Sequence, residues 1–324
     1  MKQTSNLRIL ILVAILEGLC CNQVRAMPTD SSTVIFTEYL KDQIPAKVEL
    51  VLDNHQLPDY YFSKLNTPVC EDSLCYLVKI DLYWDVLGNF MDYKTATDTA
   101  LTKFDHLKFT LEDHQKLKKI LGNNASVLLD YQAENLLDPV LKKKSEAVAD
   151  AVAGATNTSI KDEVVEGALF STYTLWHIVN GPISQKIKAY TEAKYSTKML
   201  QKMLFSENEH YQYYALQKIP QKELPQYTQE LIRLVAHGAG DVPYFAIEKI
   251  PDRTWSHPEY QLQLIKQIQQ VPFQMQNEIL NNLQNIKLSE ESIEALEKLK
   301  GTLRTNQQQK IATIISNSQT LLSQ

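Results

Sequence analysis

The segment Cys75-Tyr-Leu-Val-Lys-Ile-Asp-Leu-Tyr-Trp-Asp85 is the most strand-like part of this 324-residue sequence. It is rich in β-branched and aromatic residues, and Val78, Ile80 and Leu82 recur at every second position. Gly88-Asn89 is a turn signal, and Phe90 to Tyr93 is suited to return as the partner strand. The segment therefore predicts a β-hairpin, and with it a small sheet in the N-terminal half.

The chain before this hairpin is expected to contain one helix and one strand. Residues 27–45 carry apolar residues at helical spacing behind a candidate cap at Ser32 or Thr33. Val48 to Leu52 alternates like a strand, and Asp53-Asn54 then marks a turn.

Two more helices are expected after the hairpin. Thr110 and Asp113 form a capping box for a helix that runs from Leu111 to Leu121. Residues 162–190 predict one longer helix, with acidic residues in its first turn and an end or kink at Gly181-Pro182.

The sequence changes character from Tyr195 onward, where short amphipathic segments alternate with breaks that contain Pro or Gly. Tyr214-Ala-Leu-Gln-Lys-Ile-Pro220 matches Phe245-Ala-Ile-Glu-Lys-Ile-Pro251 at an offset of 31 residues. This spacing is typical of stacked helical pairs such as HEAT repeats. The expected helices span 197–204, 208–218, 222–237, 241–249, 256–270, 273–286, 289–300 and 305–318.

These patterns predict an α+β N-terminal domain with a small sheet over residues 27–190. An all-α, HEAT-like helical-repeat domain is expected to follow over residues 195–324. Two domains also agree with the length, at about 100–200 residues per domain.

Residues 1–26 resemble a signal peptide. A basic start precedes the apolar run Leu10 to Leu16, and Val24-Arg25-Ala26 is an acceptable cleavage site. The sequence therefore predicts an exported protein, periplasmic or secreted. A lipid anchor on Cys20 is not expected, because Leu19 stands where a small residue is needed.

Charge argues against a nucleic-acid partner. Without residues 1–26 the chain has 30 basic and 37 acidic residues, a net charge of −7. The longest basic run is Lys142-Lys143-Lys144, so no basic stripe is available for a phosphate backbone.

Cys70 and Cys75 are the cysteines that remain after cleavage at residue 26. In an exported protein an even pair most simply forms one disulfide. A redox-active pair is the alternative, whereas a metal site lacks further ligands nearby in the sequence.

A few other side chains are candidates for function. Tyr83, Trp84 and Asp85 could face a ligand, although an aromatic strand packed on a core explains them more simply. Three histidines could bind a ligand or carry protons, or serve only as hydrogen-bonding groups of helices: His106, His114 and His177.

One central stretch fits a chemically defined motif. Asp150-Ala-Val-Ala-Gly-Ala-Thr156 resembles the attachment motif of the FMN-binding domain of sodium-pumping NADH:quinone reductases and related membrane electron-transport complexes. In that family a flavin transferase joins the FMN phosphate to the hydroxyl of the last Thr. The resemblance implies that Thr156 is the acceptor, that Asp150 is the motif's Asp, and that Gly154-Ala155 is its Gly-Ala pair.

The chemistry of an ester at Thr156 suits these residue types. Gly154 and Ala155 leave room around the hydroxyl, and a following helix would direct backbone N–H groups at the phosphate. Ala153 departs from the family's Ser or Thr, so one hydroxyl contact is missing. A close-packed turn of small residues without any cofactor is the other interpretation.

Two functions are consistent with the sequence. The first is an exported electron-transfer protein that carries FMN, covalently on Thr156, and exchanges electrons with a redox partner or a membrane electron-transport complex. The second is a cofactor-free interaction protein whose helical repeats bind a protein partner. A hydrolase is disfavoured, because the sequence contains no Gly-x-Ser-x-Gly or His-Glu-x-x-His motif.

Overall fold

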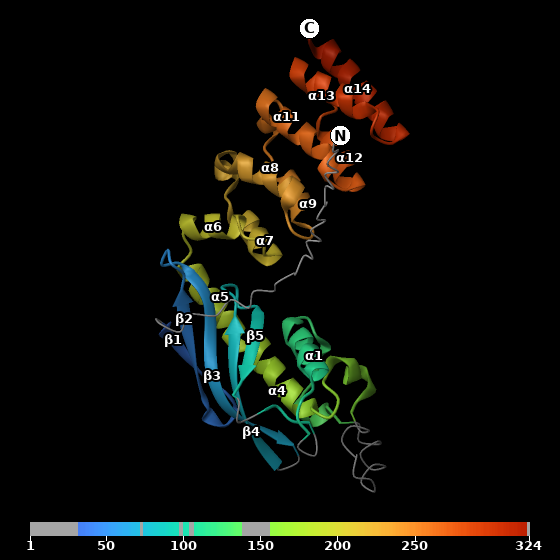
Figure 1. Cartoon of the computed structure of the whole chain (residues 1–324). Coiled ribbons are helices and arrows are strands. Elements are labelled where there is room, and N and C mark those ends of the chain that lie inside the picture. The colour runs from blue at the N-terminus through green and yellow to red at the C-terminus, as the bar shows by residue number, and fades with distance from the viewer. Residues whose placement is uncertain (1–31, 72–73, 97–99, 104–106, 138–155, 323–324) are drawn as a thin grey trace, which may run out of the picture.

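The structure, a computed structural model, describes residues 32–71, 74–96, 100–103, 107–137 and 156–322. The molecule is elongated, with a sheet and its helices at one end and a column of short helices at the other (Figure 1). The expected signal peptide lies outside the described residues.

The sheet is an antiparallel meander of five strands in the order β1-β2-β3-β4-β5. The strands are β1 (Ser32–Tyr39), β2 (Pro45–Leu52), β3 (Pro58–Glu71), β4 (Leu74–Trp84) and β5 (Phe90–Thr95). The hairpin expected around Gly88-Asn89 is confirmed, because β4 pairs with β5 across that turn. Gly88 has a φ of +82°, a backbone conformation that favours glycine.

The helix expected within residues 27–45 is wrong. Residues 32–39 form the edge strand β1, which pairs with β2 from Ser32↔Val51 to Tyr39↔Pro45. The run of β-branched and aromatic residues in 33–36 fits a pleated strand, and sheet pairing overrides the helical spacing.

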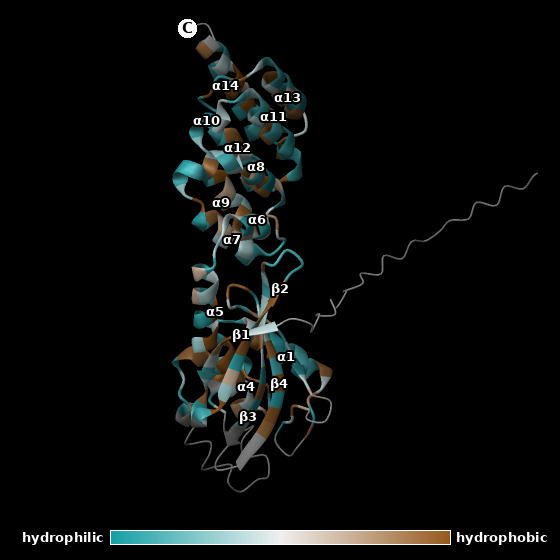
Figure 2. Ribbon diagram, turned by 90° about the vertical axis from the view of Figure 1, so that its left-hand side faces the viewer, coloured by the Kyte–Doolittle hydropathy of each residue, from teal (hydrophilic) through white to brown (hydrophobic). Residues whose placement is uncertain are grey.

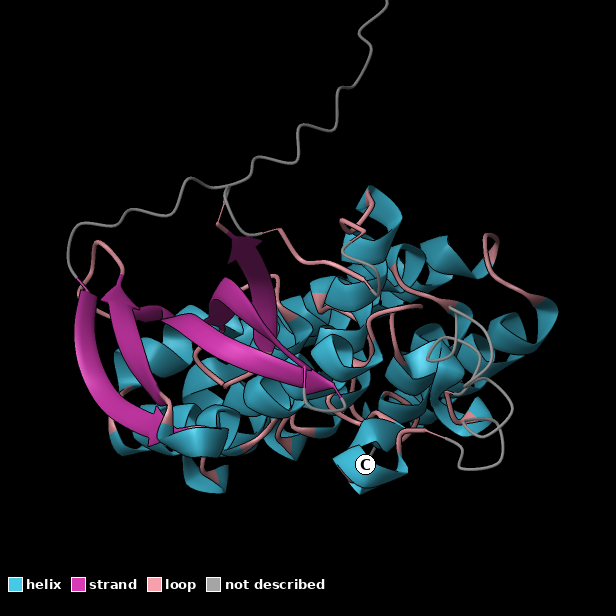
Figure 3. Ribbon diagram, turned by 90° about the horizontal axis from the view of Figure 1, so that it is seen from below, coloured by secondary structure: helices cyan, strands magenta, loops and turns pink. Residues whose placement is uncertain are grey.

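One face of the sheet packs against three helices: α1 (Leu111–Gly122), α4 (Leu169–Asn180) and α5 (Pro182–Ala193). Figure 3 shows the sheet curving over this helical layer. The inward residues Tyr61, Leu82 and Trp84 are fully buried. Trp84 Nε1 donates to the Val179 carbonyl of α4 at 2.9 Å, and the Tyr61 hydroxyl lies 2.9 Å from that of Thr191 in α5.

The single helix expected over 162–190 is corrected by the structure. A 3-10 helix, η5 (Thr158–Glu163), comes first, and α4 begins only at Leu169. Asp162 and Glu163 therefore end a short helix instead of starting a long one. The break at Gly181-Pro182 is confirmed, and a Cβ at Gly181 would lie 2.3 Å from the His177 carbonyl oxygen. Only glycine allows this close approach.

The rest of the chain is helical. It contains α6 (Thr197–Leu204), α7 (Glu209–Lys218), α8 (Thr228–His237), α9 (Val242–Glu248), α10 (Asp252–Trp255), α11 (Pro258–Gln267), α12 (Phe273–Asn282), α13 (Glu290–Lys300) and α14 (Thr305–Leu322). Helix α6 packs on α7, α8 on α9 and α13 on α14, so neighbours in sequence form pairs. Successive pairs stack, because α8 contacts α11, α11 contacts α13, and α9 contacts both α7 and α12. Figure 2 shows the resulting column, with hydrophilic and hydrophobic residues alternating along its helices.

Buried glutamines tie one pair to the next. Gln261 in α11 is fully buried; its Nε2 donates to the Lys287 carbonyl at 2.9 Å, and its Oε1 accepts from the Ser289 backbone N–H at 3.1 Å. Gln212 in α7 likewise accepts from the Ala239 N–H at 3.0 Å. These bonds satisfy backbone groups in the turns between helices, where no helical partner is available.

The sheet domain and the helical column share one continuous hydrophobic core. Polar contacts add to this junction. Lys202 of α6 binds Asp53, in the turn between β2 and β3, at 2.8 Å and Asp59, at the start of β3, at 3.3 Å. The Tyr211 hydroxyl of α7 accepts from the Val86 N–H at 3.2 Å. The column is therefore braced against the sheet and not joined by a free linker.

Replacing Gln261 with Met tests the glutamine ties. Gln261→Met keeps the volume but leaves the Lys287 carbonyl and the Ser289 N–H without their partner, which should lower the free energy of unfolding by about 2–4 kcal/mol. Urea denaturation measures the change. Gln309→Met, at an exposed position of α14, is the matched control and should change the free energy by less than about 0.5 kcal/mol. Equal effects of the two variants would show that the hydrogen bonds of Gln261 contribute nothing to the free energy of unfolding.

Candidate functional site

A groove opens between the sheet and the bend that joins α4 to α5. Its volume is about 620 Å³. One wall is the α4–α5 surface, and the other is formed by the end of β1, η1 (Lys41–Gln43) and β3. Its lining includes Tyr39, Lys41, Pro68, Phe170, Tyr173, Thr174, His177, Ile178 and Ile183. Most of this lining is apolar or aromatic, as in small-molecule sites of about 300–1,000 Å³.

Helix α4 shapes the floor of this region through side chains that bind residues 121–131, which are the end of α1, a turn and the 3-10 helix η3 (Val127–Asp130). Trp176 Nε1 donates to the Asn123 carbonyl at 2.9 Å, and the Tyr173 hydroxyl donates to the Tyr131 carbonyl at 2.9 Å. Asn180 adds a bond to the Leu121 carbonyl at 3.0 Å. The backbone carbonyls at these positions have few N–H donors in their own segment, so the side chains of α4 supply the hydrogen bonds.

The hydrogen bond of His177 fixes the tautomer of its ring. Its Nε2 lies 3.1 Å from the Leu128 carbonyl oxygen, which can only accept, so the ring carries its hydrogen on Nε2. Burial lowers the pKa of His177 below its ordinary value of 6.5, and the bond to Leu128 offsets part of this effect. The neutral ring then keeps Nδ1 as a hydrogen-bond acceptor. The expectation of a partly buried helix histidine is confirmed.

Thr156 comes two residues before η5 and lies beside Leu137. Its backbone forms an isolated β-bridge with Leu137, and the Asn157 N–H donates to the Leu136 carbonyl at 3.0 Å. Leu137 is four residues beyond Ala133 of η4 (Ala133–Asn135), which itself lines the groove. Thr156 is only 9% exposed, whereas an accessible hydroxyl was expected.

The other residues of the central motif, Asp150, Gly154 and Ala155, lie outside the described residues. So do Lys142–Lys144. The helix expected directly after Thr156 is the six-residue η5, and α4 starts thirteen residues later at Leu169. A short helix therefore does follow Thr156, and binding of a phosphate by its backbone N–H groups stays a prediction.

The strand register places the backbones of Cys70 and Cys75 directly opposite each other in the β3–β4 hairpin. Opposed positions of an antiparallel pair have Cα atoms about 4.5–5.5 Å apart. That separation falls within the range that a disulfide spans. The side chains of both cysteines lie outside the described set, so their pairing stays a prediction.

The aromatic strand residues divide between the two sheet faces. Trp84 lies in the core, and Tyr83 packs on the opposite face, with its ring 6.0 Å from Phe62 and 6.1 Å from Tyr60. Asp85 is 4% exposed and accepts the Leu87 and Asn89 N–H groups, both at 2.8 Å, in the turn before β5. Packing on the core is confirmed for Trp84, whereas Tyr83 packs in an aromatic cluster on the other face and Asp85 holds the turn.

Of the remaining histidine candidates, the structure describes His114. His114 Nδ1 lies 2.6 Å from the Tyr93 hydroxyl at the start of α1, in agreement with a hydrogen-bonding role. His106 lies outside the described residues. In the part of the chain that the structure describes, no group of three or more His, Cys, Asp or Glu side chains could hold a metal ion.

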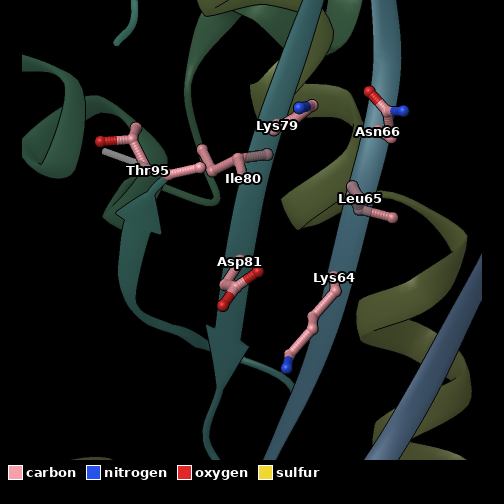
Figure 4. A pocket seen from close by; sticks show the side chains of 8 residues that line it. Lys64, Leu65, Asn66, Lys79, Ile80, Asp81 and Thr95 are labelled. Atoms are coloured by element: carbon pink, nitrogen blue, oxygen red, sulfur yellow. The ribbon is translucent and has the colours of Figure 1, made fainter. Parts of the chain in front are cut away.

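A second hollow lies across β3, β4 and β5 and is more polar than the groove. Figure 4 shows Lys64, Asn66, Lys79 and Asp81 along the two long strands, with Thr95 at the end of β5. Its volume is about 330 Å³, and Lys64 and Asp81 are paired in the strand register. This hollow is a shallow, charged part of the sheet surface.

No described helix combines the length and the apolar character that crossing a bilayer requires. Comparison of the chain with protein-family models, with curated proteins and with solved structures finds no match. The groove and the position of Thr156 are therefore the observations on which a function can be argued.

The sequence indicated His177 as a possible ligand or proton carrier, or as a hydrogen-bonding helix residue, but it did not predict the groove. The aromatic residues 170, 173 and 177 of α4 recur at helical spacing, which is a signal of a common face but not of a cavity. The missing information was the edge strand β1, which supplies the opposite wall.

His177 predicts a specific pH dependence of stability. Above pH 6.5 the ring is neutral in the folded and the unfolded chain. As the pH falls below this value the unfolded chain takes up the proton first, so the free energy of unfolding should decline until the folded pKa is passed. His177→Gln, whose amide can still donate to Leu128, should remove this part of the decline.

Urea denaturation between about pH 7.5 and pH 5 measures this difference, a range that contains the ordinary histidine pKa. His257→Gln, at an exposed position, is the control and should retain the wild-type slope. A His177→Gln variant with the full wild-type decline would contradict the interpretation of a buried, neutral ring.

Proposed function

We propose that this chain is an exported flavin carrier whose N-terminal domain holds FMN, joined through its phosphate to Thr156. The observation that supports the proposal is the bridge between Thr156 and Leu137, which ties the motif to the segment that lines the groove at Gln132 and Ala133. When bound, FMN supplies reversible electron transfer, and the chain's own residues anchor and surround it.

The residues around Thr156 set conditions for such an attachment. A hydroxyl is present, but the residue is 9% exposed, so a flavin transferase has to reach it before the bridge to Leu137 forms or by opening that bridge. The apolar groove offers a volume of about 620 Å³ for a fused ring system. The partner of the carrier would be a redox protein or a membrane electron-transport complex.

A cofactor-free interaction protein is the second candidate, and the low exposure of Thr156 favours it.

We propose that α6–α14 form HEAT-like repeats. The stacking of helix pairs and the 31-residue offset of the two matching segments support this assignment. Side-chain bonds between successive pairs have similar separations, such as Gln307 to Gln276 at 31 residues and Tyr244 to Gln274 at 30. Such an array commonly binds a protein partner.

Intact mass distinguishes the two candidates. The chain exported together with a flavin transferase should gain the mass of one FMN less water, and the gel band should fluoresce. Thr156→Ala should abolish both signals, whereas Thr156→Ser, which keeps a hydroxyl, should retain them. A wild-type mass without the increment would exclude the flavin carrier and leave the interaction protein.

A disulfide between Cys70 and Cys75 gives a separate prediction. Closing so short a loop should stabilise the chain by about 2 kcal/mol on the chain-entropy model. The double variant Cys70→Ser/Cys75→Ser should therefore melt at a lower temperature, and alkylation of the unfolded wild type should find no free thiol. A reductant should lower the wild-type melting temperature to that of the variant. Free thiols in the oxidised, exported protein would contradict the pairing.

A further inference from the structure

The groove has features of a ligand site that do not depend on Thr156. Its apolar walls remain partly open: Tyr39 is 62% exposed, and Phe170 and Tyr173 are only partly buried at the edge of the core. Ile178 and Ile183 close the base, at 7% and 1% exposure. The free energy of binding becomes more favourable when a ligand displaces water from apolar side chains such as these.

The two walls favour a flat occupant. Phe170, Tyr173, Thr174 and His177 recur every three or four residues, so they form one stripe along α4. Tyr39 and Pro68, at the ends of β1 and β3, face this stripe from the sheet side of the groove. Aromatic side chains on both walls can stack on a ring that lies between them or pack edge-on against it.

The polar groups of the groove select for a hydrogen-bond donor. His177 uses Nε2 to bind the Leu128 carbonyl, which leaves Nδ1 as the acceptor of a ring that lines the groove. Glu38 is engaged by Lys186, so its charge is compensated at the rim. Lys41 is exposed at the entrance and supplies a positive charge there.

We propose that the groove binds a planar, largely apolar fused-ring molecule with an N–H or O–H group that donates to His177 Nδ1. This inference deepens the proposed function by giving a place for the ring, but it does not rest on attachment to Thr156. The ring of a tethered flavin and a free ring compound share this chemistry. Riboflavin binding by the chain with and without tethered flavin separates these two sources.

Riboflavin is the probe, because it has the ring and a ring N–H but no phosphate that could form the ester. Full-length chain produced without a flavin transferase is titrated into riboflavin, and the loss of its fluorescence is recorded. We expect saturable binding with one site per chain. Thr174→Phe extends a ring into the groove and should weaken binding by about tenfold or more, the effect of losing roughly 1.4 kcal/mol.

Gln185→Phe is the matched control, since it adds the same ring at an exposed position of α5 outside the lining. It should bind riboflavin as tightly as the wild type does. Hydrogen exchange gives a second measurement that needs no variant: bound riboflavin should protect residues 170–178 and 38–44. Absence of saturable binding, or equal binding by Thr174→Phe and Gln185→Phe with no protection of these segments, overturns the proposal.

Flavinylated chain then identifies the source of the ring. If the tethered flavin fills the groove, the loaded chain should no longer bind riboflavin, and its flavin should show induced circular dichroism that Thr174→Phe removes without removing the mass increment. If the loaded chain still binds riboflavin, the groove serves a free ring compound. If no mass increment forms at all, the flavin carrier fails while riboflavin binding still decides the groove.

Discussion

The hydrogen bonds that α4 donates to residues 121–131 are the constraint on which the N-terminal domain depends. Helix α4 is buried between the sheet and that segment, with Leu175, Trp176 and Val179 at 1% exposure or less. Its polar side chains satisfy carbonyls that have few other partners, and an unsatisfied buried group costs about 1–3 kcal/mol. The same helix therefore contributes to the core, fixes the segment that leads to Thr156, and supplies one wall of the groove.

The helical column follows the same physical rule with different residues. Short helices leave many backbone groups unpaired at their ends, and water cannot reach those between stacked pairs. Gln212 and Gln261 are 2% and 0% exposed and bind such groups, so long amides add to the caps of the helices, such as the Ser289 hydroxyl that accepts from the Ser292 N–H. Because the core runs on from the sheet into the column, the two parts stabilise each other instead of folding around separate centres.

Local signals predicted much of this fold. The turn at Gly88-Asn89, the capping box of Thr110 and Asp113 and the break at Gly181 are confirmed, because each depends on a few neighbouring residues. Strand β1 was mistaken for a helix, because its state is decided by pairing with β2, which its own spacing does not reveal. The groove needs β1, β3 and α4 together, so it follows from the tertiary arrangement and not from any one segment.

Thr156 shows how packing and cofactor attachment can be told apart. A close-packed turn and a phosphoester both require small residues before the Thr, so the sequence treats them alike. In the structure the Thr156 backbone pairs with Leu137, beside the fully buried Leu136. A phosphate is strongly hydrated and cannot be buried against Leu136 without partners. An ester at Thr156 must therefore direct the phosphate outward or open the bridge, whereas a packing role keeps the bridge closed. The two functions therefore differ in the state of this bridge or, where the bridge stays closed, in the direction that the Thr156 side chain takes.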